Sequence, residues 1–227
     1  LLVLPSAIGS VSRTESVSPH SRDDSKYGNP SRVNQMGEAP KPLDGIKVLD
    51  LSRVFAGPVC GRILSDLGAD VVKVEPPEGD VTRLWGRKAA GLSTYYVQQN
   101  VGKQNISIDL RKDGGPDLVR QLVEHADIVI ENFRPGVMAK FGLDYESLKQ
   151  HKPDLVMVSI SGFGQDGPES GRAAYAAILH GEAGAIDVSK GVAAAHDVSF
   201  SAADVLSGMH GVIGLLAALR VRDQTGI

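Results

Sequence analysis

Asp204 is the residue whose type and position best suit chemistry. It stands in FSAADVLSGMHG, at the start of a long apolar segment whose spacing predicts a helix over residues 202–221. A carboxylate in a first helical turn gains from the helix dipole, which makes Asp204 a candidate catalytic group. An aspartate that only caps the helix fits the same pattern, so both interpretations stay open on the residues alone.

Several cationic side chains stand in predicted loops or at helix starts, where they could meet phosphate groups. They are Arg111, Arg134, Lys140 and Arg172. Taken singly, each is more typical of a solvated surface charge. The chain contains neither GxGxxG nor GxxxxGK(S/T), so nucleotide binding through those motifs is not supported.

Three further side chains have ordinary structural interpretations. Tyr175 and His180 lie in a segment, residues 173–185, that could be helical, and we expect a core tyrosine and a surface histidine. Cys60 lies on the predicted buried face of a helix, which favours a packed thiol over a nucleophile. A single cysteine allows no internal disulfide, so we expect a reducing compartment, the cytoplasm or, in a eukaryote, the mitochondrion.

The elements that position these residues begin with a strand, helix and strand. Apolar runs at residues 46–50 and 71–75 predict two strands, and helical spacing over 58–67, closed by Gly68, predicts the helix between them. A connection of this length makes the two strands parallel. We therefore expect an open α/β sheet that binds ligands at the carboxyl ends of its strands.

The alternation continues along the chain. Further strands are expected at 105–110, 128–130 and 155–160, and helices at 115–125, 137–141 and 145–150. In the last helix, the residues predicted to share one face are Val205, Met209, Ile213, Leu216 and Leu219. The predicted fold class is α/β, a doubly wound and mostly parallel sheet. Its ligand-binding end carries the loops 52–58 and 76–80.

Composition excludes some partners. The chain has 227 residues, 42% of them hydrophobic and 22% charged, with a net charge of −3. This balance supplies no Lys/Arg-rich face for a nucleic acid. No apolar run approaches the roughly 20 residues that span a bilayer, so we expect no membrane partner.

The first residues differ from the rest. Residues 1–40 are rich in Ser, Pro, Arg and Asn without an apolar period, which predicts a disordered N-terminal extension before a domain over 41–227. Our hypothesis is that Met36 is the natural start and that the preceding residues are upstream sequence or a tag.

The motifs taken together resemble the family III CoA-transferases (CaiB/BaiF), which include formyl-CoA transferase, carnitine CoA-transferase and the α-methylacyl-CoA racemases. The segments that carry the resemblance are LDGIKVLDLSRVFAGP, LGADVVKVEPPEGDVTR, GKQNISIDL, ADIVIENFRPGVMAKFGLDYESL, LVMVSISGFGQDGP and DVLSGMHGVIGLLAALRVRDQTG. They follow one another from Pro42 to Gly226 and leave the first part of the chain uncovered.

The resemblance implies a Rossmann-like large domain in a homodimer whose chains interlock as linked rings. It also implies that this chain is the N-terminal part of a longer protein, so that some apolar surface is left exposed. The implied substrates are an acyl-CoA and a carboxylic acid, with no metal.

The family's catalytic aspartate matches Asp204 through its D-x-x-x-G-M-H context. The mechanism so implied passes through an aspartyl mixed anhydride and an aspartyl-CoA thioester. It needs an ionised carboxylate, a site closed to water and backbone N–H donors for the oxyanions.

The resemblance also assigns contacts with coenzyme A. These residues are Val54, Phe55, Ala56, Ile108, Arg111, Asn132, Phe133, Arg134, Lys140 and Tyr175. Formyl-CoA transferase has glutamine where Phe55 stands, and a basic residue of the family is replaced by Pro76. Both departures argue against formyl-CoA and oxalate as substrates.

Two alternatives stay open. An acyl-CoA racemase or isomerase would pair the aspartate with a histidine, but Tyr175 stands at that position and tyrosine is a poor base at neutral pH. His180 could substitute only if its helix turned it toward Asp204. The second alternative is a non-catalytic CoA-binding fragment. Arg53, Arg172 and Lys190 hint at a dicarboxylic acid substrate.

Overall fold

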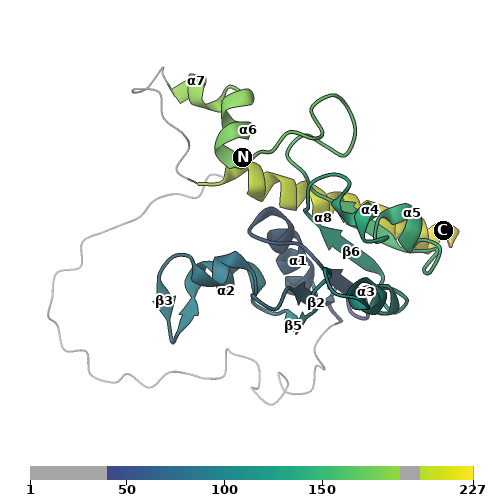
Figure 1. Cartoon of the computed structure of the whole chain (residues 1–227). Coiled ribbons are helices and arrows are strands. Elements are labelled where there is room, and N and C mark those ends of the chain that lie inside the picture. Colours follow the sequence, from purple (N-terminus) through teal and green to yellow (C-terminus); the bar gives the residue numbers. More distant parts are fainter. Residues whose placement is uncertain (1–39, 190–199, 227) are drawn as a thin grey trace, which may run out of the picture. The chain divides into compact units, whose positions relative to one another are not determined.

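The computed structural model describes residues 40–189 and 200–226 and contains a five-stranded parallel sheet (Figure 1). Its strands are β1 (Lys47–Asp50), β2 (Asp70–Glu75), β5 (Gln104–Ser107), β6 (Ile128–Glu131) and β7 (Val156–Ser159). The strand order is β5-β2-β1-β6-β7. The chain thus runs outward from β1 in both directions, which makes the sheet doubly wound and places the switch point between β1 and β6. The predicted fold class is confirmed.

Helices cover both faces of the sheet. One face carries α1 (Ala56–Asp66) and α8 (Ala202–Thr225), and the other carries α3 (Gly115–Val123), α4 (Val137–Lys140) and α5 (Tyr145–Leu148). Successive residues of a strand point to opposite faces of the sheet. Val48 packs in the hydrophobic cluster that includes α1 and α8, and Leu49 packs in the cluster on the opposite face. Cys60 is fully buried in the first cluster, as predicted for a packed thiol. Burial raises its pKa to about 12.

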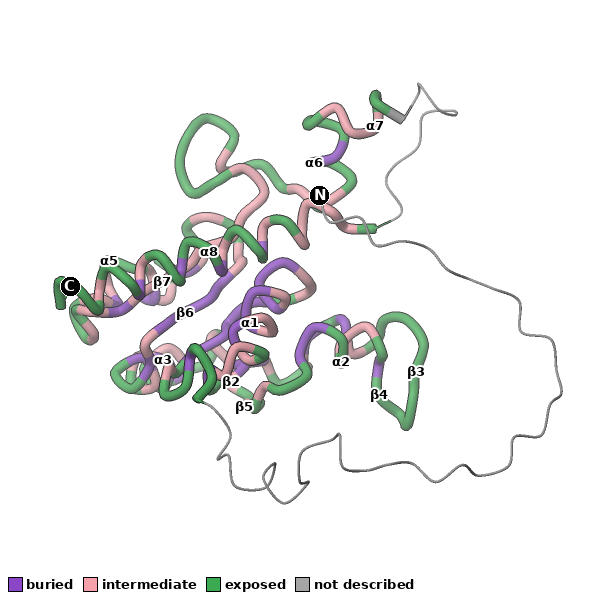
Figure 2. Tube along the Cα trace, turned by 180° about the vertical axis from the view of Figure 1, so that it is seen from behind, coloured by how far each residue is buried: buried purple, intermediate pink, exposed green. Residues whose placement is uncertain are grey.

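A segment between β2 and β5 stands apart from the sheet. It contains a short 3-10 helix, η3 (Val81–Leu84), the hairpin of β3 (Lys88–Ala89) and β4 (Leu92–Ser93), and α2 (Thr94–Asn100). Figure 2 shows the hairpin as mostly exposed, whereas buried residues concentrate in α1, β2 and β6. The sequence analysis did not predict these elements because they are short and lack an apolar period.

Two predicted boundaries need correction. The strand expected over 105–110 ends at Ser107, after which the chain leaves the sheet edge. The segment 173–185 forms two helices, α6 (Ala176–Glu182) and α7 (Ala185–Ser189), separated at Gly184, whose φ of +75° suits glycine. The first 39 residues and the extension predicted there, with Met36, lie outside the described residues.

The helix predicted over 202–221 is α8, but its buried face was predicted wrongly. The residues buried in α8 are Gly208, Val212, Leu215 and Leu219, whereas Met209, Ile213 and Leu216 are exposed. α8 is apolar all round, so periodicity could not identify the face, and the exposed side fits the expectation of uncovered apolar surface. Its 24 residues are also long and apolar enough to cross a membrane by length and composition, which corrects the statement that no run approaches that length.

A glycine selects the buried face of α8. A Cβ at Gly208 would lie 2.7 Å from the Ala56 carbonyl oxygen and 3.1 Å from Val59 Cγ1. No real side chain fits at such distances, so α8 can cross α1 this closely only through a glycine. Gly208 is one helical turn after Asp204, and this crossing therefore fixes how near Asp204 comes to α1.

We predict that Gly208→Ala lowers the free energy of unfolding by about 1–3 kcal/mol, because the added methyl group overpacks the crossing. Gly214→Ala is the matched control in the same helix, since its Cβ would meet nothing within 4 Å. It should raise stability by up to about 1 kcal/mol through helix propensity. Urea denaturation of both variants measures this, and equal effects would contradict the close crossing.

Candidate active site

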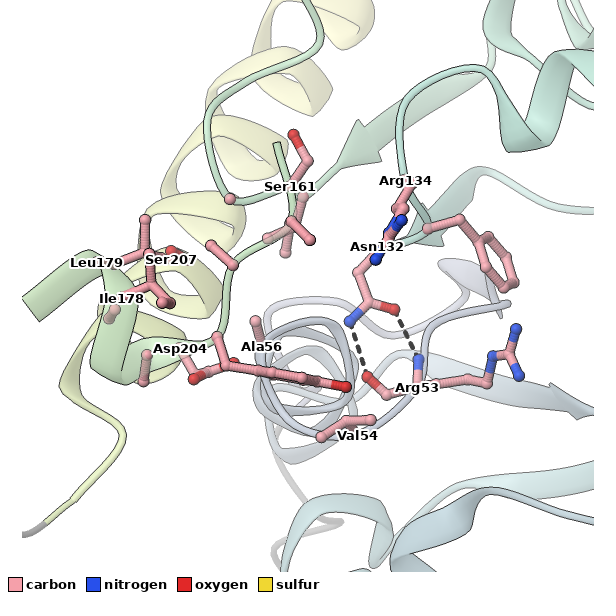
Figure 3. Close-up of a pocket in the computed structure, with 18 of the residues that line it drawn as sticks. Arg53, Val54, Ala56, Asn132, Arg134, Ser161, Ile178, Leu179, Asp204 and Ser207 are labelled. Atoms are coloured by element: carbon pink, nitrogen blue, oxygen red, sulfur yellow. Dashed lines mark hydrogen bonds between the residues drawn. The ribbon is translucent and has the colours of Figure 1, made fainter. Parts of the chain in front are cut away.

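A cavity of about 710 Å³ opens at the carboxyl ends of the strands. Its wall is built from the loops that follow β1, β2, β6 and β7, together with α6 and the start of α8. The loops 52–58 and 76–80 both contribute, as the sequence analysis expected of a ligand-binding end. Figure 3 shows Asp204 and Ala56 on one side of the cavity and Asn132 and Arg134 on the other.

Two helix N-termini meet at Asp204. The residue lies in the first turn of α8 and lines the cavity together with Ala56, the first residue of α1, whose backbone N–H favours the ionised carboxylate. Burial raises the pKa of Asp204 above the usual aspartate value, while the Ala56 N–H, its own backbone N–H and His180 act in the opposite direction. The group is thus partly removed from water and yet provided with donors for a negative charge.

His180 lies behind the start of α8. Its Nε2 accepts a hydrogen bond from the backbone N–H of Ala203 at 3.1 Å, and the residue is buried, which corrects the expectation of a surface histidine. Because Nε2 must be unprotonated to accept, His180 satisfies one of the free N–H groups at this helix end. Tyr175 was expected in a core but is 74% exposed at the start of α6.

An amide ties the two loops at the switch point together. The backbone N–H of Arg53 donates to Asn132 Oδ1 and Asn132 Nδ2 donates to the Arg53 carbonyl oxygen, both at 2.7 Å (Figure 3). The Arg53 guanidinium lies over the Phe133 ring, 4.9 Å from its centroid. Asn132 therefore fixes the wall of the cavity and leaves the charged end of Arg53 exposed.

The cavity brings together most of the predicted site residues. Those in its lining are Val54, Ala56, Asn132, Phe133, Arg134, Tyr175 and Asp204. Four others lie elsewhere. Phe55 packs against the Tyr95 ring, Ile108 packs against the core, Arg111 pairs with Asp109 and Glu78, and Lys140 is exposed on α4. Their contacts with coenzyme A stay predictions.

The arginines at the cavity differ in what they already bind. Arg172 pairs with Glu169 and Glu182. Within residues 40–189 and 200–226, the guanidinium groups of Arg53 and Arg134 have no carboxylate partner. They are free to meet an anionic ligand, whereas Lys190 lies outside the described residues.

The described part of the chain holds no group of three His, Cys, Asp or Glu side chains that could bind a metal ion. The chemistry that the geometry offers is that of a half-buried carboxylate next to backbone N–H donors. Such an arrangement suits nucleophilic attack on a carbonyl group.

Comparison with known proteins gives a family match over most of the chain. The model of CoA-transferase family III matches residues 43–227. The succinate–glutarate CoA-transferase of Agrobacterium fabrum is 43% identical over 196 residues, covering 82% of this chain and 49% of that protein. The succinyl-CoA–D-citramalate CoA-transferase of Chloroflexus aurantiacus is 42% identical over 192 residues, covering 82% and 47%.

A solved structure gives the same result. A CaiB/BaiF family protein from Brucella suis superposes with a TM-score of 0.79 at 44% identity, covering 83% of this chain and 51% of that one. The chain spans about half the length of the curated relatives it matches.

We predict that Asp204→Asn stabilises the protein near neutral pH. Because burial raises the pKa, the folded state holds the Asp204 proton more tightly than the unfolded chain does. Ionised Asp204 therefore lowers the free energy of unfolding above its folded pKa, and this loss disappears as the pH falls below the unfolded value. Urea denaturation across pH should show the variant to be more stable at neutral pH, with the difference shrinking in acid.

Asp70→Asn is the control for this comparison, because Asp70 is exposed at the far end of β2 and outside the cavity. It should change stability little at any pH. An Asp204→Asn variant less stable than the wild type at neutral pH would contradict the prediction.

Proposed function

The chain belongs to CoA-transferase family III, and on that premise we propose that the protein moves coenzyme A from an acyl-CoA to a carboxylic acid with Asp204 as the nucleophile. The observation that carries the proposal is the position of Asp204. Its carboxylate lies half-buried in the cavity, where the starts of α1 and α8 meet.

The proposed reaction begins when the Asp204 carboxylate attacks the thioester carbonyl carbon. The C–S bond breaks, the CoA thiolate leaves, and an aspartyl mixed anhydride forms. The thiolate then attacks the aspartyl carbonyl, releasing the first acid and leaving an aspartyl-CoA thioester. The acceptor carboxylate attacks this thioester, the C–S bond breaks and the CoA thiolate leaves again, which gives a second anhydride. The thiolate finally attacks the acceptor acyl carbonyl of this anhydride, forming the new acyl-CoA and releasing the Asp204 carboxylate.

The surroundings of Asp204 suit each of these steps. The Ala56 N–H favours the ionised carboxylate, and the same donor can stabilise the oxyanion that develops on the aspartyl carbonyl. Partial burial removes water that would hydrolyse an anhydride.

We propose that the acceptor acid carries a second carboxylate. The two relatives compared above are named for glutarate and citramalate, which are both dicarboxylates. Arg53 lines the cavity, and its guanidinium, which lies over Phe133 and has no carboxylate partner among the described residues, can pair with the remote carboxylate.

The isomerase alternative receives less support. Tyr175 is largely exposed, and the Nε2 of His180 is occupied by the Ala203 N–H. A second base able to return a proton beside Asp204 is therefore not found among the described residues.

Trapping of the covalent intermediate tests the proposal. The full-length protein is incubated with succinyl-CoA and hydroxylamine, and its peptides are mapped by mass spectrometry. We expect a hydroxamate at Asp204, because both the anhydride and the thioester are attacked by hydroxylamine. Asp204→Ala should show none, whereas Asp223→Ala, on the exposed end of the same helix, should still be modified at Asp204.

Two results would count against the covalent route. The first is modification of Asp204→Ala at the same rate as the wild type. The second is no modification with any of a panel of thioesters although CoA binds, and this would favour the isomerase or the CoA-binding fragment.

Arg53→Gln tests the acceptor class. We expect KM for succinate or glutarate to rise about tenfold or more, as for a lost charge-assisted pair, with little change for a monocarboxylic acceptor. Arg172→Gln is the control, since that guanidinium is already paired with two glutamates. A rise in KM for every acceptor and for the acyl-CoA would assign Arg53 to coenzyme A instead.

A further inference from the structure

Val54 has an uncommon backbone conformation next to the site. Its φ is +69°, in the left-handed region that β-branched residues rarely adopt. Such a conformation is strained and persists only where surrounding contacts over-determine it. Val54 is two residues before Ala56, which lines the cavity together with Asp204 and whose N–H favours the ionised carboxylate, so the contacts that hold Val54 also orient this N–H.

Those contacts come from a buried ion pair. Lys73 Nζ donates to the Ser52 carbonyl oxygen at 2.7 Å, and the Val54 N–H donates to Asp80 Oδ2 at 3.1 Å. Lys73 Nζ and Asp80 Oδ2 lie 3.3 Å apart, and both side chains are fully buried. The two charges therefore neutralise each other, and the hydrogen-bonding capacity that is left binds the backbone of the loop.

Asp80 is itself fixed from the other side. Its backbone N–H donates to Glu75 Oε2 at 2.9 Å, and its Oδ1 accepts from the Thr82 N–H and hydroxyl group at 3.0 and 2.8 Å. Glu75 is in turn bound by Arg83 and Tyr96. The carboxylate that receives Val54 thus has little freedom to move.

Stability alone does not account for this pair. A buried ion pair costs so much desolvation that an apolar pair of similar size is often as stable or more stable. What this ion pair does specifically is to fix two backbone groups just before α1, the Ser52 C=O and the Val54 N–H.

We propose that Lys73 and Asp80 are positioning residues for the transferase reaction, holding the loop 52–56 so that the Ala56 N–H meets Asp204. The inference rests on the proposed function of Asp204. It assigns to the pair an effect on the chemical step rather than on binding, because neither side chain lines the cavity.

Asp80→Asn in the full-length protein tests the proposal. We expect kcat, and the rate of hydroxylamine trapping at Asp204, to fall by a factor on the order of 10 to 10², with KM for the acyl-CoA nearly unchanged. The acid limb of the rate profile should also move to higher pH, since a donor that lowers the Asp204 pKa is weakened. The other titratable groups facing Asp204 are His180 and Tyr95, which the variant leaves in place.

Asp127→Asn is the matched control. Asp127 also joins a cation to a backbone N–H, pairing with Arg222 at 3.0 Å and accepting from the Lys47 N–H at 2.9 Å, but at the opposite end of the sheet. It should lower stability without changing kcat or the acid limb. Should Asp80→Asn fail to fold, Lys73→Met with Asp80→Leu removes both charges together and should give the same kinetic defect in a folded protein.

Three results would overturn the proposal. The first is a folded Asp80→Asn variant whose kcat and acid limb of the pH–rate profile are unchanged, and the second is a folded double variant with unchanged kcat. The third is that Asp80→Asn and Asp127→Asn both lose activity only in proportion to their loss of stability. Failure of the wild type to be trapped at Asp204 would instead overturn the proposed function.

Discussion

The approach of the Ala56 backbone N–H to the Asp204 carboxylate, where two helix starts meet in the cavity wall, is the contact on which the site depends. It joins the start of α1, which follows the first strand, to the start of α8, about 150 residues later in the chain. Each end is placed by a different constraint. The sheet and the loop before α1 place the donor, and the close crossing at Gly208 places the acceptor. The cavity is the space left between these elements and the loop after β6.

The same contact balances two opposed requirements. A nucleophilic carboxylate must be ionised, yet the burial that protects an anhydride from water favours the protonated form. Donors at two helix N-termini reduce that penalty without adding a full positive charge, which would hold the carboxylate too firmly to react. The full charges of Lys73 and Asp80 are buried outside the cavity lining, where they bind backbone groups of the loop before α1.

The sequence allowed the sheet, the first helix and the candidate Asp204 to be predicted, because each follows from local pattern or motif. Apolar runs mark strands buried on both faces, and Gly68 marks a helix end. The positive φ of Val54 and the burial of His180 could not be predicted, since both depend on partners distant in sequence. A valine carries no local sign of a left-handed turn, unlike a glycine.

The apolarity of α8 shows why composition alone does not decide where a helix lies. By length and hydropathy it could span a membrane, yet polar contacts tie both its ends to the α/β domain. At its start, the Ala203 N–H donates to His180 Nε2, and near its end Arg222 pairs with Asp127, which precedes β6. The crossing at Gly208 lies between them and leaves no room for a side chain at that position. α8 is therefore a layer of the sheet domain, and its outer apolar residues form the surface of that layer.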